Sequence, residues 1–226
     1  LQKVIIDENV RLELCEMGSQ GDTLATHDGA QISVFGGIPG EVVDASIRHF
    51  KRQGRQMAVG QVVTVIEASR HRVVPPCPYY GPCTGCDWQH ISYQHQLHLK
   101  KLRVQEALKA SPELSHVLVS ETLPSPQEFE YRNHARLTVR RHGQLGFVSR
   151  ITRRWTRVDE CMLMTSGINQ KLRELQEHCG DTTQLSIRYG INTDDWLIQP
   201  RLSMVTPTGQ THYNERLLGA TFRVAS

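Results

Sequence analysis

The sequence has no long apolar run, which excludes a helix that crosses a bilayer. It has 226 residues, 38% of them hydrophobic and 22% charged, a composition typical of a soluble protein of about two domains. No secretory signal is visible, and the chain begins at Leu1, so we expect trimming at the N-terminus. The protein is therefore predicted to be a cytoplasmic monomer with no membrane partner.

No acidic residue occurs between Glu130 and Asp159, although this interval contains eight arginines. Residues 48–55 form a second acid-free basic cluster. Such stretches suit a polyanion, and nucleic acid is the first candidate because guanidinium groups make forked contacts to phosphate. A solvated charged face is the alternative. The predicted RNA contacts are Lys51, Arg52, Arg55, Arg132, Arg136, Arg153 and Arg154, of which we expect about half to touch RNA.

Aromatic residues are scarce, at 6% of the chain. Tyr79, Tyr80, Trp88 and Phe147 are the candidates for stacking on RNA bases. Packing around the cysteine loop or in the core is the alternative, and it is favoured for Trp88 and Phe147.

Three of the six cysteines lie in one loop, spaced C-x5-C-x2-C over residues 77–86. The loop is rich in proline and glycine, so it is neither helix nor strand. Clustered cysteines in a chain with no visible leader favour metal binding over disulfides. A fourth ligand is required, and Cys161, at a strand end before a helix, is preferred to Cys179. Cys15 is a third candidate but is expected to pack as a small apolar residue.

Only one C-x2-C pair is present, whereas structural zinc sites more often use two. A 4Fe–4S cluster is therefore preferred, with zinc as the alternative.

The hydrophobic pattern predicts an α+β fold. Strands are expected at 10–14, 23–27, 31–35, 41–50, 57–66, 131–140, 144–149, 154–158, 184–189 and 196–199, with a possible strand at 116–119 and a weaker one at 202–206. Helices are expected at 91–110 and 166–178. Five short strands with glycine turns suit a small barrel of the oligonucleotide-binding (OB) type. We therefore predict a barrel over 1–68, a cysteine loop over 69–90 and a mixed α/β central domain over 91–226.

Several short motifs follow one another in a characteristic order. They are Gly-Gly-Ile-Pro-Gly-Glu at 36–41, the cysteine loop with Trp-Gln-His at 88–90, Tyr-Arg-Asn-His-Ala-Arg at 131–136, Gly-Phe at 146–147, Asp-Glu-Cys at 159–161, and Leu-Gly at 218–219 before Phe-Arg-Val-Ala-Ser at 222–226. In this order they resemble the RNA uracil-5-methyltransferases that carry an N-terminal TRAM domain and an iron–sulfur cluster. The match spans nearly the whole chain, and the cysteine loop with its distant fourth cysteine is its most specific part.

The resemblance implies that residues 1–68 form a TRAM barrel of the OB type. It assigns Cys77, Cys83, Cys86 and Cys161 as ligands of a structural 4Fe–4S cluster. It also implies S-adenosylmethionine-dependent methyl transfer to C5 of a uridine, with ribosomal RNA as the partner. In that chemistry a thiolate adds to the base and is later eliminated, and the base must leave its stack.

The sequence departs from the family at Ser226, where the domain that binds S-adenosylmethionine would begin. We therefore expect no catalytic or S-adenosylmethionine-binding residue in this chain, and no methyl transfer by the fragment alone. The competing interpretation is a non-catalytic RNA-binding adaptor stabilised by an iron–sulfur or zinc centre. A radical S-adenosylmethionine enzyme fits less well, because its cysteines are spaced C-x3-C-x2-C.

Overall fold

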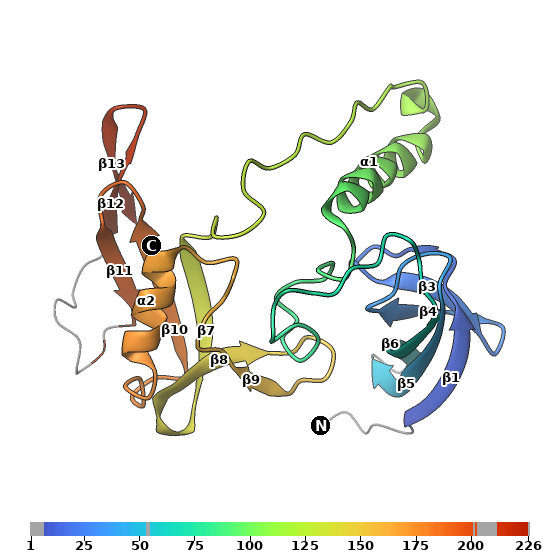
Figure 1. The fold of residues 1–226 in the computed structure, drawn as a ribbon, viewed down its shortest axis with the longest axis horizontal. Helices are drawn as coiled ribbons and strands as arrows, with labels where there is room; N and C mark the ends of the chain where they lie inside the picture. Colours follow the sequence, from blue (N-terminus) through green and yellow to red (C-terminus); the bar gives the residue numbers. More distant parts are fainter. Residues whose placement is uncertain (1–6, 53–54, 201, 203–211, 226) are drawn as a thin grey trace. The chain divides into compact units, whose positions relative to one another are not determined.

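The computed structural model describes residues 7–52, 55–200, 202 and 212–225. The fold is α+β, as predicted, and is dominated by sheets (Figure 1). The chain forms two compact units. The first combines residues 1–76 and 86–124, and the second combines residues 77–85 and 125–226. No described helix combines the length and apolar character needed to cross a membrane.

The first unit contains a six-stranded sheet in the order β1-β5-β6-β4-β3-β2. Its strands are β1 (Asp7–Glu13), β2 (Glu16–Met17), β3 (Thr23–His27), β4 (Ala30–Phe35), β5 (Val42–Arg52) and β6 (Arg55–Glu67). All neighbours are antiparallel except β4 and β6, which pair in parallel. The five predicted strands are confirmed. Among the described residues β1 and β2 do not pair with each other, so the sheet is not the closed barrel that was expected.

The hairpin between β3 and β4 turns at Asp28 and Gly29, which have φ values of 49° and 72°. Positive φ at both central residues is the requirement of a tight hairpin turn, which explains the Asp-Gly pair. Alternate residues of β5, namely Val43, Ala45 and Ile47, are fully buried. This period of two is what a strand with one buried face produces, and it builds the core of the first unit.

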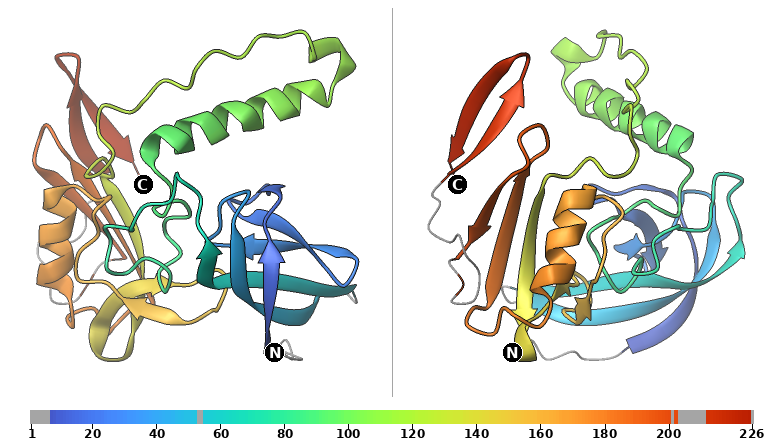
Figure 2. Two further views of the ribbon diagram at one scale, coloured as in Figure 1. Left: turned by 45° about the vertical axis from the view of Figure 1, so that its right-hand side comes forward. Right: turned by 60° about the vertical axis from the view of Figure 1, so that its left-hand side comes forward.

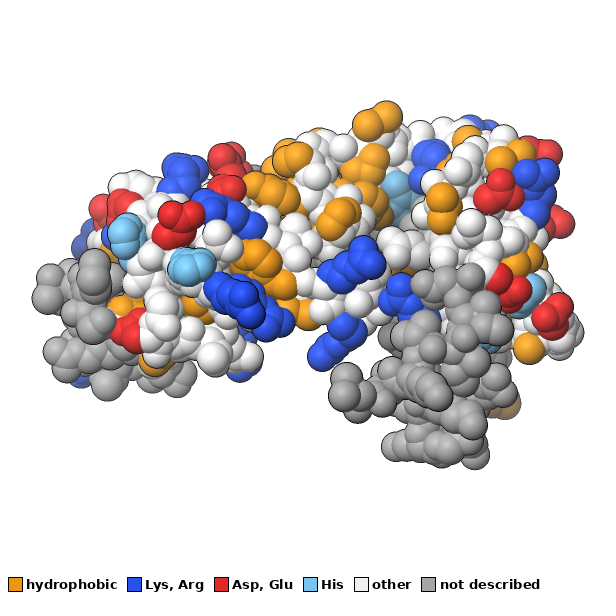
Figure 3. Space-filling view, turned by 90° about the horizontal axis from the view of Figure 1, so that it is seen from below, with side chains coloured by type: hydrophobic (Ala, Val, Ile, Leu, Met, Phe, Trp, Pro, Cys, Tyr) orange, Lys and Arg blue, Asp and Glu red, His pale blue; other side chains and the backbone are white. Residues whose placement is uncertain are grey.

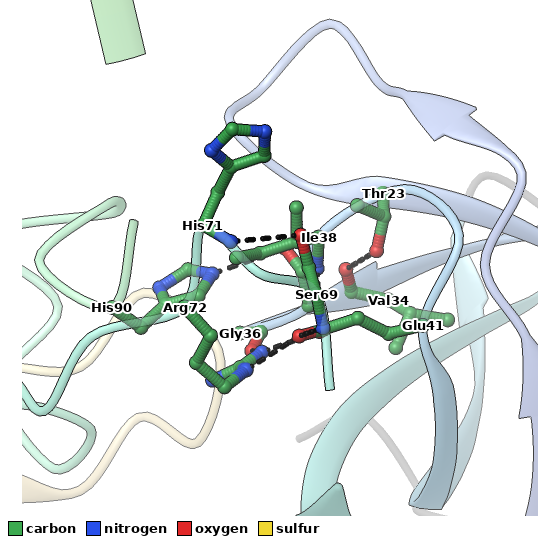
Figure 4. Close-up of polar contacts among 10 residues, drawn as sticks. Thr23, Val34, Gly36, Ile38, Glu41, Ser69, His71, Arg72 and His90 are labelled. Atoms are coloured by element: carbon green, nitrogen blue, oxygen red, sulfur yellow. Dashed lines mark hydrogen bonds and ion pairs between the residues drawn. The ribbon is translucent and has the colours of Figure 1, made fainter. Parts of the chain in front are cut away.

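A buried ion pair joins three segments of the first unit (Figure 4). The Glu41 carboxylate is fully buried and accepts both Arg72 Nε–H and Nη2–H at 2.6 Å. It also accepts the backbone N–H groups of Ile38 at 2.9 Å and Ser69 at 3.1 Å. Nearby, the buried His90 ring contacts Gly37 O at 3.0 Å. These contacts fix the glycine-rich turn at residues 36–40 to the segment that leaves β6.

The predicted helix is confirmed as α1 (Tyr93–Lys109), followed by a 3-10 turn at Pro112–Leu114. Ile91 and Leu99 pack with Ile38 and the partly buried Trp88. The possible strand at 116–119 is wrong, because this segment has no strand conformation. Leu118 is 95% exposed, and β-branched neighbours alone do not make a strand without a partner and a buried face.

The second unit contains an antiparallel sheet in the order β11-β10-β7-β8-β9, with a separate β12–β13 hairpin (Figures 1 and 2). Its strands are β7 (His134–Arg140), β8 (Gln144–Val148), β9 (Trp155–Arg157), β10 (Gln184–Gly190), β11 (Asp195–Gln199), β12 (His212–Leu217) and β13 (Ala220–Ala225). Helix α2 (Ser166–Leu175) packs Ile168, Leu172 and Leu175 into the core of this unit.

The predicted hairpin around His142 and Gly143 is confirmed, but α2 ends three residues earlier than expected. Its end has two causes. Glu177 has a φ of 69°, and the Gln176 side chain turns inward to bond Leu145 N–H at 2.8 Å and Leu145 O at 3.1 Å. The weak strand expected at 202–206 lies outside the described residues, apart from Leu202.

Candidate thiol cluster and nucleic-acid interface

The cysteine loop of residues 77–85 is fixed within the second unit by two side-chain contacts. The Tyr79 ring packs against the core, and its hydroxyl accepts Asp159 N–H at 3.3 Å. Thr84 Oγ1 accepts Arg150 N–H at 2.7 Å. The loop is therefore attached both to the strand end before Cys161 and to the turn after β8.

The backbone of the loop forms a compact turn that brings two cysteines together. Tyr80 N–H donates to Cys77 O at 3.1 Å, and Cys83 N–H donates to Tyr79 O at 2.9 Å. Gly81, with a φ of 96°, occupies a conformation that side-chain-bearing residues rarely adopt. The proline and glycine content of this segment thus serves a defined turn.

Cys161 is held by a single buried amide, that of Asn169 on α2. Asn169 Oδ1 accepts Cys161 N–H at 2.9 Å, while Nδ2 donates to Cys161 O at 3.0 Å and to Met164 O at 3.2 Å. Asn169 is only 5% exposed. The sequence analysis missed this residue. The available signal was an asparagine in the first half of a helix, where it is a poor helix former unless it bonds locally.

The backbone of Arg132 pairs in parallel with residues 163–165, the segment that follows Cys161. Its N–H donates to Leu163 O at 2.7 Å, and its C=O accepts Thr165 N–H at 2.9 Å. This pairing sets Arg132, two residues before β7, beside the segment that follows Cys161, so that one predicted RNA contact lies near a predicted metal ligand.

Burial and neighbouring charges both act on the pKa values of the Cys83 and Cys161 thiols. Burial raises the pKa of Cys83, and charge on Cys161 and Cys77 raises it further. Burial likewise raises the pKa of Cys161, with a contribution from Cys77. The Arg132 guanidinium lowers both pKa values. The arrangement favours thiols in the free protein but provides a cation for thiolates that bind a metal.

No group of three or more His, Cys, Asp or Glu residues has metal-binding geometry among the described residues. None of the cysteines forms a disulfide. Cys86, the fourth predicted ligand, belongs to the first unit and follows Cys83 by three residues. Cys77, Cys83 and Cys161 all belong to the second unit, as does Arg132, and thiolates are the ligands that zinc and iron–sulfur clusters take.

The two other cysteines differ from this set. Cys179 is fully buried, its thiol donates to Leu175 O at 3.3 Å, and burial raises its pKa to about 11. It is therefore a core thiol. Cys15 is exposed, and its thiol contacts Glu13 O at 3.8 Å. The expectation that it packs as an apolar residue is wrong, because it lies in the short turn between β1 and β2, outside the buried alternation.

The face of the β7–β10 pair opposite the core is polar and basic. Paired positions alternate, so Ala135 and Ile187 point into the core while their neighbours point away. On the outer face, Arg136 donates to Gln184 Oε1 at 2.8 Å, and His134 Nε2 contacts Ser186 Oγ at 3.0 Å. Burial lowers the pKa of His134, and Arg188 and Arg136 lower it further.

Arg188 belongs to this face and was not predicted. Its Nε is buried and has no hydrogen-bond partner among the described residues. The signal was its position in β10 directly opposite His134, which only the strand pairing reveals. Two guanidinium groups and an imidazole thus share one outer face.

The arginines predicted to contact RNA in the second unit differ from other arginines of that unit in whether they form ion pairs with carboxylates. Arg157 pairs with Asp159 and Glu177, and Arg173 with Glu160. Within the described part of the chain, no carboxylate pairs with the exposed residues Arg132, Arg136, Arg153 and Arg154. Figure 3 shows Lys and Arg side chains at several places on the face of the molecule seen there, with Asp and Glu side chains among them. The positive charge of these four arginines is therefore available to an anion.

The basic turn between β5 and β6 is less completely described. Lys51, Arg52 and Arg55 lie at the strand ends, but their side chains are outside the described part. The aromatic candidates separate more clearly. Phe147 packs against the core of the second unit, and Trp88 packs beside Ile91 and donates Nε1–H to Gly21 O at 3.0 Å. Packing, the favoured interpretation for both, is confirmed.

The chain's relatives are RNA methyltransferases. It is 31% identical over 198 residues to an uncharacterized RNA methyltransferase of Halalkalibacterium halodurans, matching 76% of this chain and 43% of the relative. It is 28% identical over 210 residues to an uncharacterized RNA methyltransferase of Gloeobacter violaceus, matching 84% of this chain and 45% of the relative. It is 37% identical over 154 residues to the 23S rRNA (uracil(1939)-C(5))-methyltransferase RlmD of Halomonas elongata, matching 66% of this chain and 31% of the relative.

The sequence matches no protein-family model. The chain spans less than half the length of these relatives.

Proposed function

We propose that this chain is the RNA-binding portion of an S-adenosylmethionine-dependent RNA uridine C5-methyltransferase that acts on ribosomal RNA. The observation that carries the proposal is the set of exposed arginines without carboxylate partners, in a chain whose relatives are RNA methyltransferases. S-adenosylmethionine would supply the methyl group in the whole protein. The residues of this chain would bind the RNA and orient it.

The predicted contacts have different roles in this proposal. Arg136, with Arg188 and His134 beside it, offers N–H donors on one sheet face to consecutive phosphates. Arg153 and Arg154 follow β8 in an exposed turn whose Ser149 hydroxyl accepts Thr152 N–H at 3.0 Å. Lys51, Arg52 and Arg55 would contact RNA from the first unit. Residues 1–68 would act as the TRAM domain, despite the open strand order of their sheet.

We further propose that Cys77, Cys83, Cys86 and Cys161 hold a 4Fe–4S cluster. The support is the proximity of three of the thiols, the absence of disulfides among the described residues and the cationic Arg132 beside them. The role of the cluster would be structural, because it ties together the cysteine loop and the loop before α2. No redox step is assigned to it.

RNA binding is tested with a fluorescently labelled fragment of 23S ribosomal RNA and the 226-residue chain, by anisotropy at several salt concentrations. Arg136→Gln should weaken binding and reduce the slope of log Kd against log salt by about one. Arg173→Gln is the control, because that guanidinium is also exposed but pairs with Glu160. Equal effects of the two substitutions, or no RNA binding by the unaltered chain, would refute the proposed interface.

The cluster is tested by anaerobic purification, visible absorption, and iron and sulfide assays. Cys161→Ser should lose iron and colour, whereas Cys15→Ser should keep both because Cys15 is exposed in the first unit. Colourless protein with stoichiometric zinc would overturn the assignment.

A further inference from the structure

Three histidines from two segments of the first unit gather at the start of α1. His71 lies in the segment that follows β6, and His95 and His98 lie one turn apart on α1. The rings of His71 and His95 are stacked, with centroids 3.8 Å apart and an interplanar angle of 3°. The His98 ring follows, 5.7 Å from that of His95. None of these residues belongs to the thiol cluster or to the sheet face of the second unit.

The stack is bounded by a cation. Arg70 Nε–H donates to His71 Nε2 at 3.1 Å, so this ring nitrogen is the acceptor of the contact. Figure 4 shows the His71 ring directed away from the Glu41–Arg72 ion pair. Arg70 and His98 are exposed, whereas His71 and His95 are half-buried.

The close stacking of the three histidine rings disfavours positive charge on more than one of them. Two imidazolium rings at a stacking distance would repel each other. The pKa of His95 is lowered by burial first, and then by His71, His98 and Arg70. Anions near the rings would relieve this repulsion and favour protonation.

The other charged groups facing the stack do not supply such an anion. Lys101 comes from α1 and Glu121 from the segment after the 3-10 turn, and the two form an ion pair. The pKa of Glu121 is lowered mainly by Lys101, and to a smaller extent by His98. The carboxylate that faces His98 is thus already bound to a lysine.

The three stacked histidines are poorly arranged to bind a metal ion. Within the described part of the chain, no set of three His, Cys, Asp or Glu residues has metal-binding geometry. Stacked rings also direct their nitrogens along parallel edges, whereas a metal requires them to converge. The edges present N–H donors beside an arginine, which is the donor type that a phosphate accepts from.

We propose that Arg70, His71, His95 and His98 form a second RNA-binding site, which takes a phosphodiester group and gains a proton when it does so. The site rests on the proposed function for its partner, since RNA is the polyanion assigned to this chain. The proton gained would place positive charge on the stacked rings, beside the Arg70 guanidinium. The site would therefore bind RNA more tightly as the pH falls through the histidine range.

The test measures RNA affinity between about pH 6 and pH 8 at constant ionic strength, with EDTA present. Uptake of one proton per complex strengthens binding up to about tenfold per pH unit. The double variant His95→Gln/His98→Gln should bind as the unaltered chain does near pH 8, within about twofold, and about tenfold more weakly near pH 6. His116→Gln is the matched control, since His116 is an exposed histidine of the same unit.

A second variant tests the site without changing a residue of helix α1, in case the double variant disturbs that helix. Arg70→Gln alters an exposed residue outside α1 and should reduce the slope of log Kd against log salt by about one. Circular dichroism and thermal unfolding establish that each variant folds.

Two results would overturn the inference. If the unaltered chain binds RNA but the double variant keeps its full pH dependence and Arg70→Gln keeps the salt slope, this site is refuted and the proposed function stands. If the unaltered chain binds no RNA at any pH, the proposed function fails and this site fails with it.

Discussion

Replacing Glu41 by glutamine should destabilise the first unit far more than replacing an exposed carboxylate. The fully buried Glu41 carboxylate accepts four N–H hydrogen bonds, two of them from Arg72. Glutamine keeps one acceptor oxygen but turns an NH2 group toward N–H donors, and it leaves the Arg72 guanidinium, 21% exposed, without its counter-charge. Breaking a buried pair in this way costs about 3–5 kcal/mol, which lowers the unfolding midpoint of a unit this size by roughly 10–20 °C.

The same residue makes a prediction for acid sensitivity. Burial opposes ionisation of Glu41, but hydrogen bonds from Arg72, Ser69 and Ile38 outweigh it, so its pKa lies below the ordinary value of 4.5. A carboxyl group whose pKa is lower in the folded state stabilises the fold fully above the unfolded pKa. That contribution is lost as the pH falls through the folded pKa. The unaltered protein should therefore lose stability below about pH 4.5 more steeply than Glu41→Gln does.

The assay is urea unfolding monitored by hydrogen-exchange mass spectrometry, which measures the unfolding of strands β4 to β6 separately from that of strands β7 to β11. Asp44→Asn is the matched control, because it removes an exposed ion pair between Arg11 and Asp44, three residues after Glu41, and exposed pairs contribute little. The double variant Glu41→Met/Arg72→Leu should lose less stability than Glu41→Gln, since no charge is left buried. Unfolding free energies for Glu41→Gln and Asp44→Asn that agree within about 0.5 kcal/mol would refute the reasoning.

Three further predictions concern the second unit. Gly143→Ala should lower the free energy of unfolding by about 1–3 kcal/mol or more in chemical denaturation, because Gly143 has a φ of 73° and a methyl group there would lie 2.6 Å from Cys179 N. Gly180→Ala is the control and should have little effect, because a methyl group there meets no atom within 4 Å. Equal losses for the two substitutions would contradict this reasoning. Gln176→Ala should cost about 1–3 kcal/mol in the same measurement, because it leaves the buried Leu145 N–H without its acceptor; an unchanged unfolding curve would show that the contact is unimportant. If the proposed cluster is bound, Asn169→Ala should weaken its retention about 10–100-fold in iron assays, since Asn169 fixes the backbone of Cys161. Gln170→Ala changes an exposed neighbour on α2 and should retain iron as the unaltered protein does.

The sequence was most informative where local chemistry determines structure. Asp28-Gly29 predicted a hairpin because only that turn type requires two positive φ values. The hydrophobic pattern predicted a strand over residues 41–50, and β5 is found at Val42–Arg52. The proline and glycine content around the cysteines predicted a loop, and residues 77–85 contain neither a helix nor a strand.

The sequence was least informative where the structure depends on pairing across long separations. Arg188 faces His134 only because β10 pairs with β7, and this register cannot be read from either strand alone. Asn169, on α2, and Gln176, at its end, were missed because polar residues at such positions are usually solvated, whereas here each bonds backbone groups of another segment. The open strand order of the first unit also depends on which strands meet, since the same five strands with glycine turns suit a barrel.

The division of the chain into units has a consequence for dissecting this protein. Residues 77–85 belong to the second unit although the segments on either side belong to the first, so the polypeptide passes between units at three places, after Pro76, Gly85 and Pro124. No single peptide cleavage can therefore release both halves whole. A fragment that begins at Ser125 would lack Tyr79 from its interior, and we expect it to be recovered intact only when a peptide carrying the missing turn is supplied alongside it.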